Sequence, residues 1–140
     1  MKLLIDTDVL MDVALNREPF VEAAADFMDE AQAQPGMTFI AWHSASNFFY
    51  MVSSPKGKAV ARDFFKDLLR FVGVAPVATE DLTYALGLDM PDFEDAMQVA
   101  AAVACKADYI VTRNVEHYRK SPVKTLTPDA WLHRYGRGPS

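Results

Sequence analysis

The sequence is poor in cysteine, with one such residue among 140. A single thiol excludes a disulfide within the chain and a zinc site built from cysteines. Cys105 stands in an alanine-rich segment of helical pattern, so we expect it in the core. His43 and His117 lack the spacing of zinc ligands. We expect both at the surface or, for His117, beside the functional site.

Long apolar runs are missing as well. The longest uncharged apolar runs, such as Ala100 to Cys105, are far shorter than the roughly 20 residues of a membrane-spanning helix. Asp6 interrupts the apolar start of the chain before it reaches the length of a signal-peptide core. These absences predict a cytoplasmic protein with no membrane partner.

Basic residues are outnumbered, since 14 lysines and arginines stand against 19 aspartates and glutamates, for a net charge of −5. This balance argues against binding of nucleic acid through a broadly basic surface, so any such contact must be local. Acids gather in segment 89–95, which holds four of them within seven residues. Cations gather in segment 56–70, which holds five of them and two acids.

No internal repeat or low-complexity segment is present, and 51% of the residues are apolar. This composition predicts one domain, which we place over residues 1–135, followed by a flexible tail over 136–140. The expected strands are 2–5, 37–42, 72–77, 109–112 and 123–126. The expected helices are one capped by Asp8, then 20–34, 44–52, 56–71, 80–88 and 92–106, and a terminal helix that starts at 127–129. Strands that alternate with helices predict an α/β fold, a three-layer sandwich with a central, mainly parallel sheet flanked by helices.

Three residues are expected to mark helix ends. Asp8 is placed to cap the helix after the first strand. Pro55 is expected to end helix 44–52 together with the two serines before it and to open the next helix. Asp92 can cap the alanine-rich helix that follows it, with Asp95 favouring the helix dipole.

Acidic side chains gather at the ends of the expected strands. Asp6 ends the first strand, Asp92 and Asp95 begin a helix, and segment 112–114 follows another strand. Because the carboxyl ends of parallel strands meet at one edge of a sheet, we expect these residues to converge. Converging carboxylates repel one another unless a cation joins them, and hard oxygen ligands favour Mg²⁺ or Mn²⁺. The sequence thus predicts a site for a divalent ion.

Segments 4–10, 91–96 and 110–114, taken in this order and spacing, resemble the PIN domain family. The resemblance runs to about Leu126 and includes the loop 17–20. It implies a metal-dependent endoribonuclease on a PIN-like fold, in which metal-activated water cleaves RNA phosphodiesters with Mg²⁺ or Mn²⁺ as cofactor. It further implies the toxin half of a toxin–antitoxin pair, with a small antitoxin as partner, and a homodimer.

The resemblance also assigns roles within the site. It makes Asp6, Asp92 and Asp95 the metal ligands, and these three with Asn114 the catalytic residues. It makes Asn47, Thr112 and Arg113 supporting residues.

Two positions depart from the common pattern of the family. Many members carry a glutamate in the helix after the second strand, and the matching place here holds Asn47. Many also carry an acid after the final motif, where this chain has Glu116 and His117. A site with fewer carboxylates predicts modest metal affinity.

A basic stripe is expected on the helix of segment 56–71. Its members recur every four residues and are Lys58, Arg62, Lys66 and Arg70. Such a spacing predicts a slowly drifting row of cations that follows RNA phosphates without reading bases. The alternative is a solvated face on which Asp63 and Asp67 are the partners of these cations.

Two other functions stay open at this point. Asp6 and Asp8 after an apolar strand are also similar to the haloacid-dehalogenase phosphatases, in which the first acid is a nucleophile. That family needs a glycine soon after the second acid, and Val9 and Leu10 offer none. A catalytically weak or inactive module that binds RNA or protein is the other alternative, because Asn47 removes a charge.

Overall fold

A computed structural model describes residues 1–137 and shows five parallel strands in one sheet. The strands are β1 (Leu3–Ile5), β2 (Thr38–Ile40), β3 (Val72–Val74), β4 (Tyr109–Val111) and β5 (Lys124–Leu126). Their order across the sheet is β3-β2-β1-β4-β5, and each neighbouring pair is parallel. Leu3 of the central strand pairs in register with Thr38 on one side and Tyr109 on the other.

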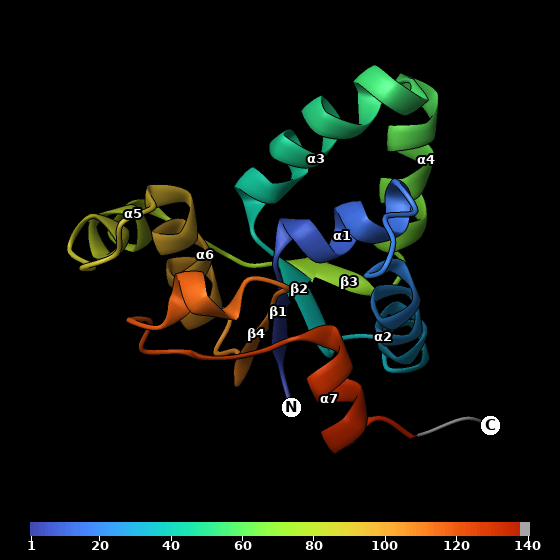
Figure 1. The fold of residues 1–140 in the computed structure, drawn as a ribbon. Helices are drawn as coiled ribbons and strands as arrows, with labels where there is room; N and C mark the ends of the chain where they lie inside the picture. Colours follow the sequence, from blue (N-terminus) through green and yellow to red (C-terminus); the bar gives the residue numbers. More distant parts are fainter. Residues whose placement is uncertain (138–140) are drawn as a thin grey trace.

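Helices cover both faces of the sheet (Figure 1). They are α1 (Thr7–Ala14), α2 (Val21–Ala33), α3 (Trp42–Lys56), α4 (Lys58–Leu68), α5 (Thr79–Leu86), α6 (Phe93–Ala104), the 3-10 helix η1 (Val115–Tyr118) and α7 (Pro128–Tyr135). Leu3 and Ile5 point to one face, where they share a core with α1, α2, α3, α4 and α7. Leu4 points to the opposite face and packs with α6. The alternation of a buried strand therefore produces two cores, and the predicted three-layer α/β sandwich is confirmed.

The strand order places a crevice beside β1. From β1 the chain crosses to β2 on one side, and later elements return to β4 on the other side. Connections that leave in opposite directions open a gap at the carboxyl ends of the two strands, which is the usual ligand site of open parallel sheets. Asp6 and Thr112 follow β1 and β4 directly at this edge.

Helix α3 extends further than the sequence predicts. Pro55 lies inside its last turn, and the helix ends at Gly57, whose φ of 93° is favourable only for glycine. The backbone N–H of Gly57 donates to the carbonyl of Ser53 at 2.8 Å, which closes this end. The expected end at Pro55 is wrong because the glycine, and not the proline, provides the conformation that stops the helix.

Cys105 is buried, as expected for a core residue.

The first residues of the expected C-terminal tail contact α2. Arg137 donates from its backbone N–H and its Nε to Glu30 of α2, at 2.9 and 3.0 Å, so this contact holds the chain just after Gly136. Residues 138–140 of the expected tail lie outside the described residues. Within residues 1–137, no helix has the length and apolar character needed to cross a membrane.

Candidate active site

Asp6 lies at the centre of the crevice, where β1 ends and α1 begins. Its Oδ1 accepts the backbone N–H of Thr7 at 2.7 Å, so Asp6 is the N-cap of α1. Its Oδ2 accepts the hydroxyls of Thr112 at 2.9 Å and Tyr118 at 2.8 Å. The expectation that Asp8 caps this helix is wrong, because the extended backbone at Asp6 (φ −69°, ψ 152°) turns its carboxylate onto the first N–H group.

Asp8, in the first turn of α1, points toward the loop after β4. Its Oδ2 accepts the backbone N–H of Arg113 at 3.1 Å, the Asn114 side-chain amide at 3.0 Å and the Thr112 hydroxyl at 3.3 Å. Its Oδ1 is buried and has no hydrogen-bond partner in the described part of the chain. The site therefore contains a second carboxylate, from the first turn of α1, with one oxygen that has no hydrogen-bond partner in the described part of the chain.

Asp95 comes from the first turn of α6 and approaches Asp6 through a tyrosine. The Tyr118 hydroxyl lies 2.8 Å from Asp6 Oδ2 and 3.3 Å from Asp95 Oδ1. The two carboxylates are thus separated by a single hydroxyl group, which is close enough to share an ion through its waters. His117 Nδ1 lies 3.9 Å from Asp95 Oδ2, which places this histidine beside the site.

Asp92 lies outside the cavity wall, unlike Asp95. Its Oδ1 accepts the backbone N–H groups of Glu94 at 2.8 Å and Asp95 at 3.2 Å, so Asp92 is the N-cap of α6. Its side chain is exposed and is not part of the cavity wall. The structure therefore shows Asp92 in the capping role that the sequence offered as an alternative.

A cavity of about 550 Å³ opens over these carboxylates. Its wall is formed by Asp6, Thr7, Asp8, Met11, Arg17, Ser46, Asn47, Tyr50, Met51, Glu94, Asp95, Gln98 and Arg113. Asn47 faces the cavity from α3, and its amide lies 3.4 Å from Glu94 Oε2. Glu94 thus brings a carboxylate to the region where Asn47 provides an uncharged amide.

A buried ion cluster supports the cavity from the next turn of α1. Asp12 is 1% exposed, and it accepts Nε and Nη2 of Arg113 at 2.9 and 3.2 Å. Arg17 Nε lies 2.9 Å from the same carboxylate, although this contact lacks hydrogen-bond geometry. The Arg113 guanidinium also lies over the ring of Phe20, at 4.1 Å from its centroid. Two guanidinium groups are therefore held at the edge of the cavity.

A polar network joins α1, α3 and α6 behind the carboxylates. The Gln98 amide nitrogen donates to Ser44 Oγ at 2.9 Å and lies 3.4 Å from Thr7 Oγ1 and from His43 Nε2. The Thr7 hydroxyl donates to Ser44 at 2.8 Å. His43 is half-buried in this network, so its expected surface position is wrong, and burial lowers the pKa of its imidazole. The network fixes how the three helices meet at the site.

The carboxylates in the cavity resist ionisation. Burial, together with the neighbouring charge of Asp6, raises the pKa of Asp8 to about 7. Burial, together with the charges of Asp92 and Asp6, raises the pKa of Asp95 to about 6. The pKa of Asp6 is also raised by burial, against the lowering effect of its hydrogen bonds from Tyr118 and Thr112. Burial likewise raises the pKa of Tyr118, which keeps its hydroxyl protonated as a donor.

This donor set suits a hard divalent cation. Within residues 1–137, no three His, Cys, Asp or Glu side chains are already gathered closely enough to form a complete metal site. The unpartnered Oδ1 of Asp8 and the raised pKa values nevertheless show an excess of carboxylate oxygen over positive charge. A cation among these oxygens would relieve both the desolvation and the mutual repulsion.

Three members of the basic stripe, Lys58, Arg62 and Lys66, lie on α4, and Arg70 follows the end of this helix at Leu68. Lys58, Arg62, Lys66 and Arg70 are all exposed, and none of them lines the cavity. In the described part of the chain, no carboxylate lies within 4.0 Å of their charged groups. Asp63 and Asp67 are therefore not salt-bridge partners of these cations, so the pairing expected in the alternative is wrong.

The structure brings most of the expected site residues together and adds several others. Asp6, Asp95, Asn114, Thr112, Arg113 and Asn47 meet at one edge of the sheet. Asp8, Asp12 and Tyr118 were missed as site residues. Asp8 and Asp12 stand one and two helical turns from the strand end, a spacing that could have found them. Tyr118 had no such signal, because the 3-10 helix that carries it is not evident from the sequence.

Comparison with known proteins agrees with this geometry. A family model described as "PIN domain" matches residues 2–116, and the chain belongs to this family. PIN domains are generally nucleases, which places the chain among hydrolases that act on nucleic acid. No curated protein matches the sequence.

One solved structure with a similar fold is that of VapBC2 from Rickettsia felis, bound to a DNA fragment from their promoter. The two chains superpose with a TM-score of 0.66 at 15% sequence identity, over 91% of this chain and 98% of that chain. At this identity the likeness shows the fold alone.

Proposed function

We propose that this protein is a metal-dependent endoribonuclease, the toxin of a toxin–antitoxin pair, that uses Mg²⁺ or Mn²⁺ to cleave RNA phosphodiesters. The observation that carries the proposal is the cavity in which Asp6, Asp8 and Asp95 have raised pKa values and a buried oxygen without a partner. Membership of the PIN family supports nuclease chemistry at this site.

The proposed metal ligands are Asp6 and Asp95, with Asp8 as a further carboxylate and Asp92 reached through water. A divalent ion held there supplies Lewis acidity, which lowers the pKa of water and polarises a phosphate oxygen. Tyr118 keeps Asp6 and Asp95 at a fixed separation by its hydroxyl contacts. Asn114 and Thr112 hold the Asp8 carboxylate and act as supporting groups.

Positive groups in the cavity wall suit an RNA backbone. Arg17 and Arg113 place guanidinium groups there, and both are partly exposed, with side-chain exposures of 35% and 26%. Guanidinium groups bind phosphate oxygens through paired N–H donors. The stripe of Lys58, Arg62 and Lys66 would add affinity along the strand with little preference for sequence.

The proposed partners are a small antitoxin and a second copy of the chain, in the cytoplasm. The structure with a similar fold is that of a complex named VapBC2. This likeness supports the proposal of an antitoxin partner. We also consider a weak or inactive binding module, because Asn47 provides no charge. Glu94 argues against that alternative, since its carboxylate lies next to the Asn47 amide at 3.4 Å.

The test is cleavage of a mixed pool of RNA with Mg²⁺ or Mn²⁺, with and without a chelator. Asp6→Asn should abolish cleavage and leave the fold intact, because asparagine is also a good N-cap and can still accept the Thr7 N–H. Asp63→Asn on α4 is the matched control and should cleave normally. Cleavage by Asp6→Asn at the wild-type rate would contradict the proposal, and release of phosphate from a simple ester without RNA cleavage would favour the phosphatase.

A further inference from the structure

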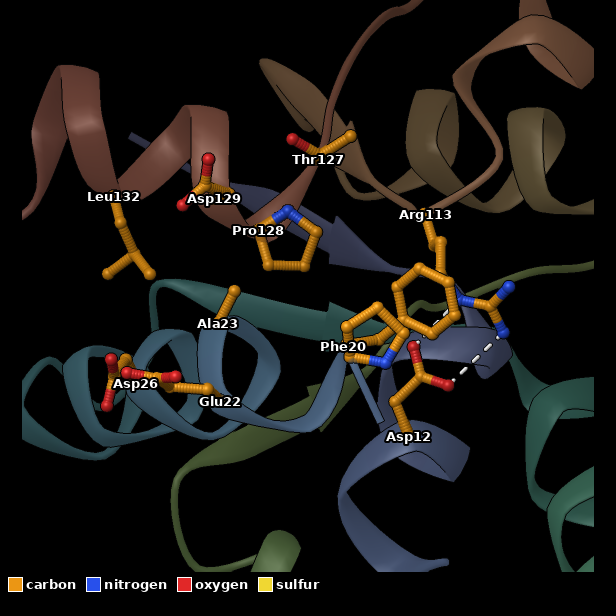
Figure 2. Close-up of a pocket in the computed structure, with 11 residues that line it drawn as sticks. Asp12, Phe20, Glu22, Ala23, Asp26, Arg113, Thr127, Pro128, Asp129 and Leu132 are labelled. Carbon is orange, nitrogen blue, oxygen red and sulfur yellow. Dashed lines mark hydrogen bonds and ion pairs between the residues drawn. The ribbon is translucent and has the colours of Figure 1, made fainter. Parts of the chain in front are cut away.

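A second cavity of about 520 Å³ lies between α2 and α7 (Figure 2). Its apolar lining comes from Pro19 and Phe20 in the loop before α2, from Ala23, and from Pro128 and Leu132 of α7. Arg113 and Asp12 also line it, and Arg113 is shared with the cavity that contains Asp6, Asp8 and Asp95. We call this cavity the α2–α7 groove.

Acidic side chains edge the α2–α7 groove. Glu22 and Asp26 stand on α2 and Asp129 stands on α7, and all three are exposed (Figure 2). In residues 1–137 no lysine, arginine or histidine lies within 4.0 Å of these carboxylates. The one cation in the groove, Arg113, is already paired with Asp12. The groove therefore presents uncompensated negative charge over an apolar floor.

Local helix chemistry explains only part of this charge. Glu22 and Asp129 lie in the first turns of their helices, where the dipole favours acids. Asp26 lies four residues after Glu22 on the same helix, and like charges at this spacing repel each other. A cation bound between them would relieve this repulsion, so the charge pattern points to a basic occupant.

We propose that the α2–α7 groove binds a segment of a partner protein in which a lysine or arginine adjoins an apolar residue. The aliphatic stem of such a side chain packs on Phe20, Ala23 and Leu132 while its charged head meets the carboxylates at the edge. Nucleic acid does not fit, because its phosphates would face three acids. A free polyamine would use the carboxylates but leave the apolar floor uncovered.

Arg113 connects the α2–α7 groove with the cavity that contains Asp8. The Arg113 guanidinium lies over Phe20 at 4.1 Å, and the Arg113 backbone N–H donates to Asp8 at 3.1 Å. A segment that presses on Phe20 therefore acts on a residue that orients a carboxylate of the cavity. The binding itself does not depend on the proposed nuclease function, so the two can fail separately.

The probe is the blocked peptide acetyl-Gly-Leu-Arg-Leu-Lys-Gly-amide, titrated into the ¹⁵N-labelled full chain while amide chemical shifts are recorded. We expect saturable shifts at residues 20–26, 129–132 and 113. The double variant Asp26→Asn with Asp129→Asn should weaken binding about fivefold to tenfold. The control variant Asp63→Asn with Asp67→Asn, on α4, should bind as the wild type does.

Four results would overturn the proposal. The first is the absence of shifts at the groove residues up to about 5 mM peptide. The second is that a peptide with glutamine at both basic positions binds as tightly as the basic peptide, and the third is that the Asp26→Asn and Asp129→Asn double variant binds the peptide as tightly as the wild type. The fourth is that spermidine binds in the groove as tightly as the peptide. The first three would remove the basic segment as the occupant. The last would identify a polyamine instead.

Discussion

Asp8 and Asp12 stand one turn apart on the same helix, α1, and have opposite surroundings. Asp12 is 1% exposed and is matched by two arginines, with Arg113 bound through two hydrogen bonds. Asp8 receives only neutral donors, from Thr112, Arg113 and Asn114, and keeps one buried oxygen without a partner.

The difference shows where the molecule keeps unbalanced charge. Asp12 is a buried carboxylate whose charge is matched by arginines, so its removal would leave their charges unpaired. A buried carboxylate next to other carboxylates is costly in the absence of a cation, as the raised pKa of Asp8 shows. The same helix therefore contains one buried acid that is paired with arginines and one whose charge has no cationic hydrogen-bond partner in the described part of the chain.

The largest expected effect comes from breaking the matched pair. Asp12→Asn leaves Arg113 and Arg17 without their counter-charge, and we expect it to lower the free energy of unfolding by about 2–4 kcal/mol. This is less than for a fully buried pair, because both arginines are partly exposed. Urea denaturation measures the loss, and Asp29→Asn, on the exposed face of α2, is the control. A loss as small as that of the control would mean that the cluster is not structural.

Asp8→Asn should have the opposite effect on the metal-free protein. The pKa of Asp8 is about 7 in the folded protein against an ordinary value of 3.8, so between these pH values the folded wild type retains a proton that the unfolded chain has lost. The contribution of Asp8 to stability therefore falls as pH rises from about 4 to about 7. The variant should lose this slope and be more stable at pH 8, by about 1–3 kcal/mol. Denaturation curves at several pH values, with the variant compared to the wild type, would show no difference in slope if Asp8 were normally solvated.

Asn47→Glu should add negative charge to the cavity that contains Asp8. Asn47 lines the cavity, so a glutamate there adds a carboxylate beside Asp6, Asp8 and Asp95. We expect Mg²⁺ or Mn²⁺ to bind about tenfold more tightly and cleavage to rise at low metal concentration. Ser54→Glu, further along α3, is the control. Equal metal affinity in both glutamate variants and the wild type would place position 47 outside the metal site.

The smallest effect concerns the basic stripe, which lies outside both acid environments. Replacing Lys58, Arg62 and Lys66 with glutamate should weaken RNA binding and lower the slope of its salt dependence by up to about 2. A variant with Lys124→Glu and Arg134→Glu, on β5 and α7, should keep the wild-type slope. Filter binding of one RNA over a range of salt concentrations measures both, and an unchanged slope in the α4 variant would make the stripe a solvated face.

The alternation of patterns along the sequence was enough to predict the layers of the fold. Short apolar runs followed by amphipathic segments predict parallel strands between helices, and this arrangement is confirmed. The ends of elements were less predictable. Strand 37–42 contracts to Thr38–Ile40 and helix 44–52 extends to Trp42–Lys56, because tertiary packing and the positive φ of Gly57 decide where hydrogen bonding changes.

The site was predictable where a residue ends a strand or begins a helix, as for Asp6 and Asp95. It was not predictable where tertiary contacts decide the role of a side chain. Asp8 was expected to cap its helix, yet the loop after β4 donates three hydrogen bonds to it. Tyr118 reaches Asp6 across 112 residues of sequence, and no local pattern indicates such a contact.

The most direct test is a calorimetric titration of Mn²⁺ into the wild type and Asp6→Asn at about pH 6.5, where an Asp8 carboxyl with a pKa of about 7 still carries its proton. The wild type should bind the ion with release of protons, because its carboxylates have raised pKa values. Asp6→Asn, which keeps the helix cap, should bind at least about tenfold more weakly. Equal affinity in the two proteins, without proton release, would contradict the claim that this cavity is a metal site.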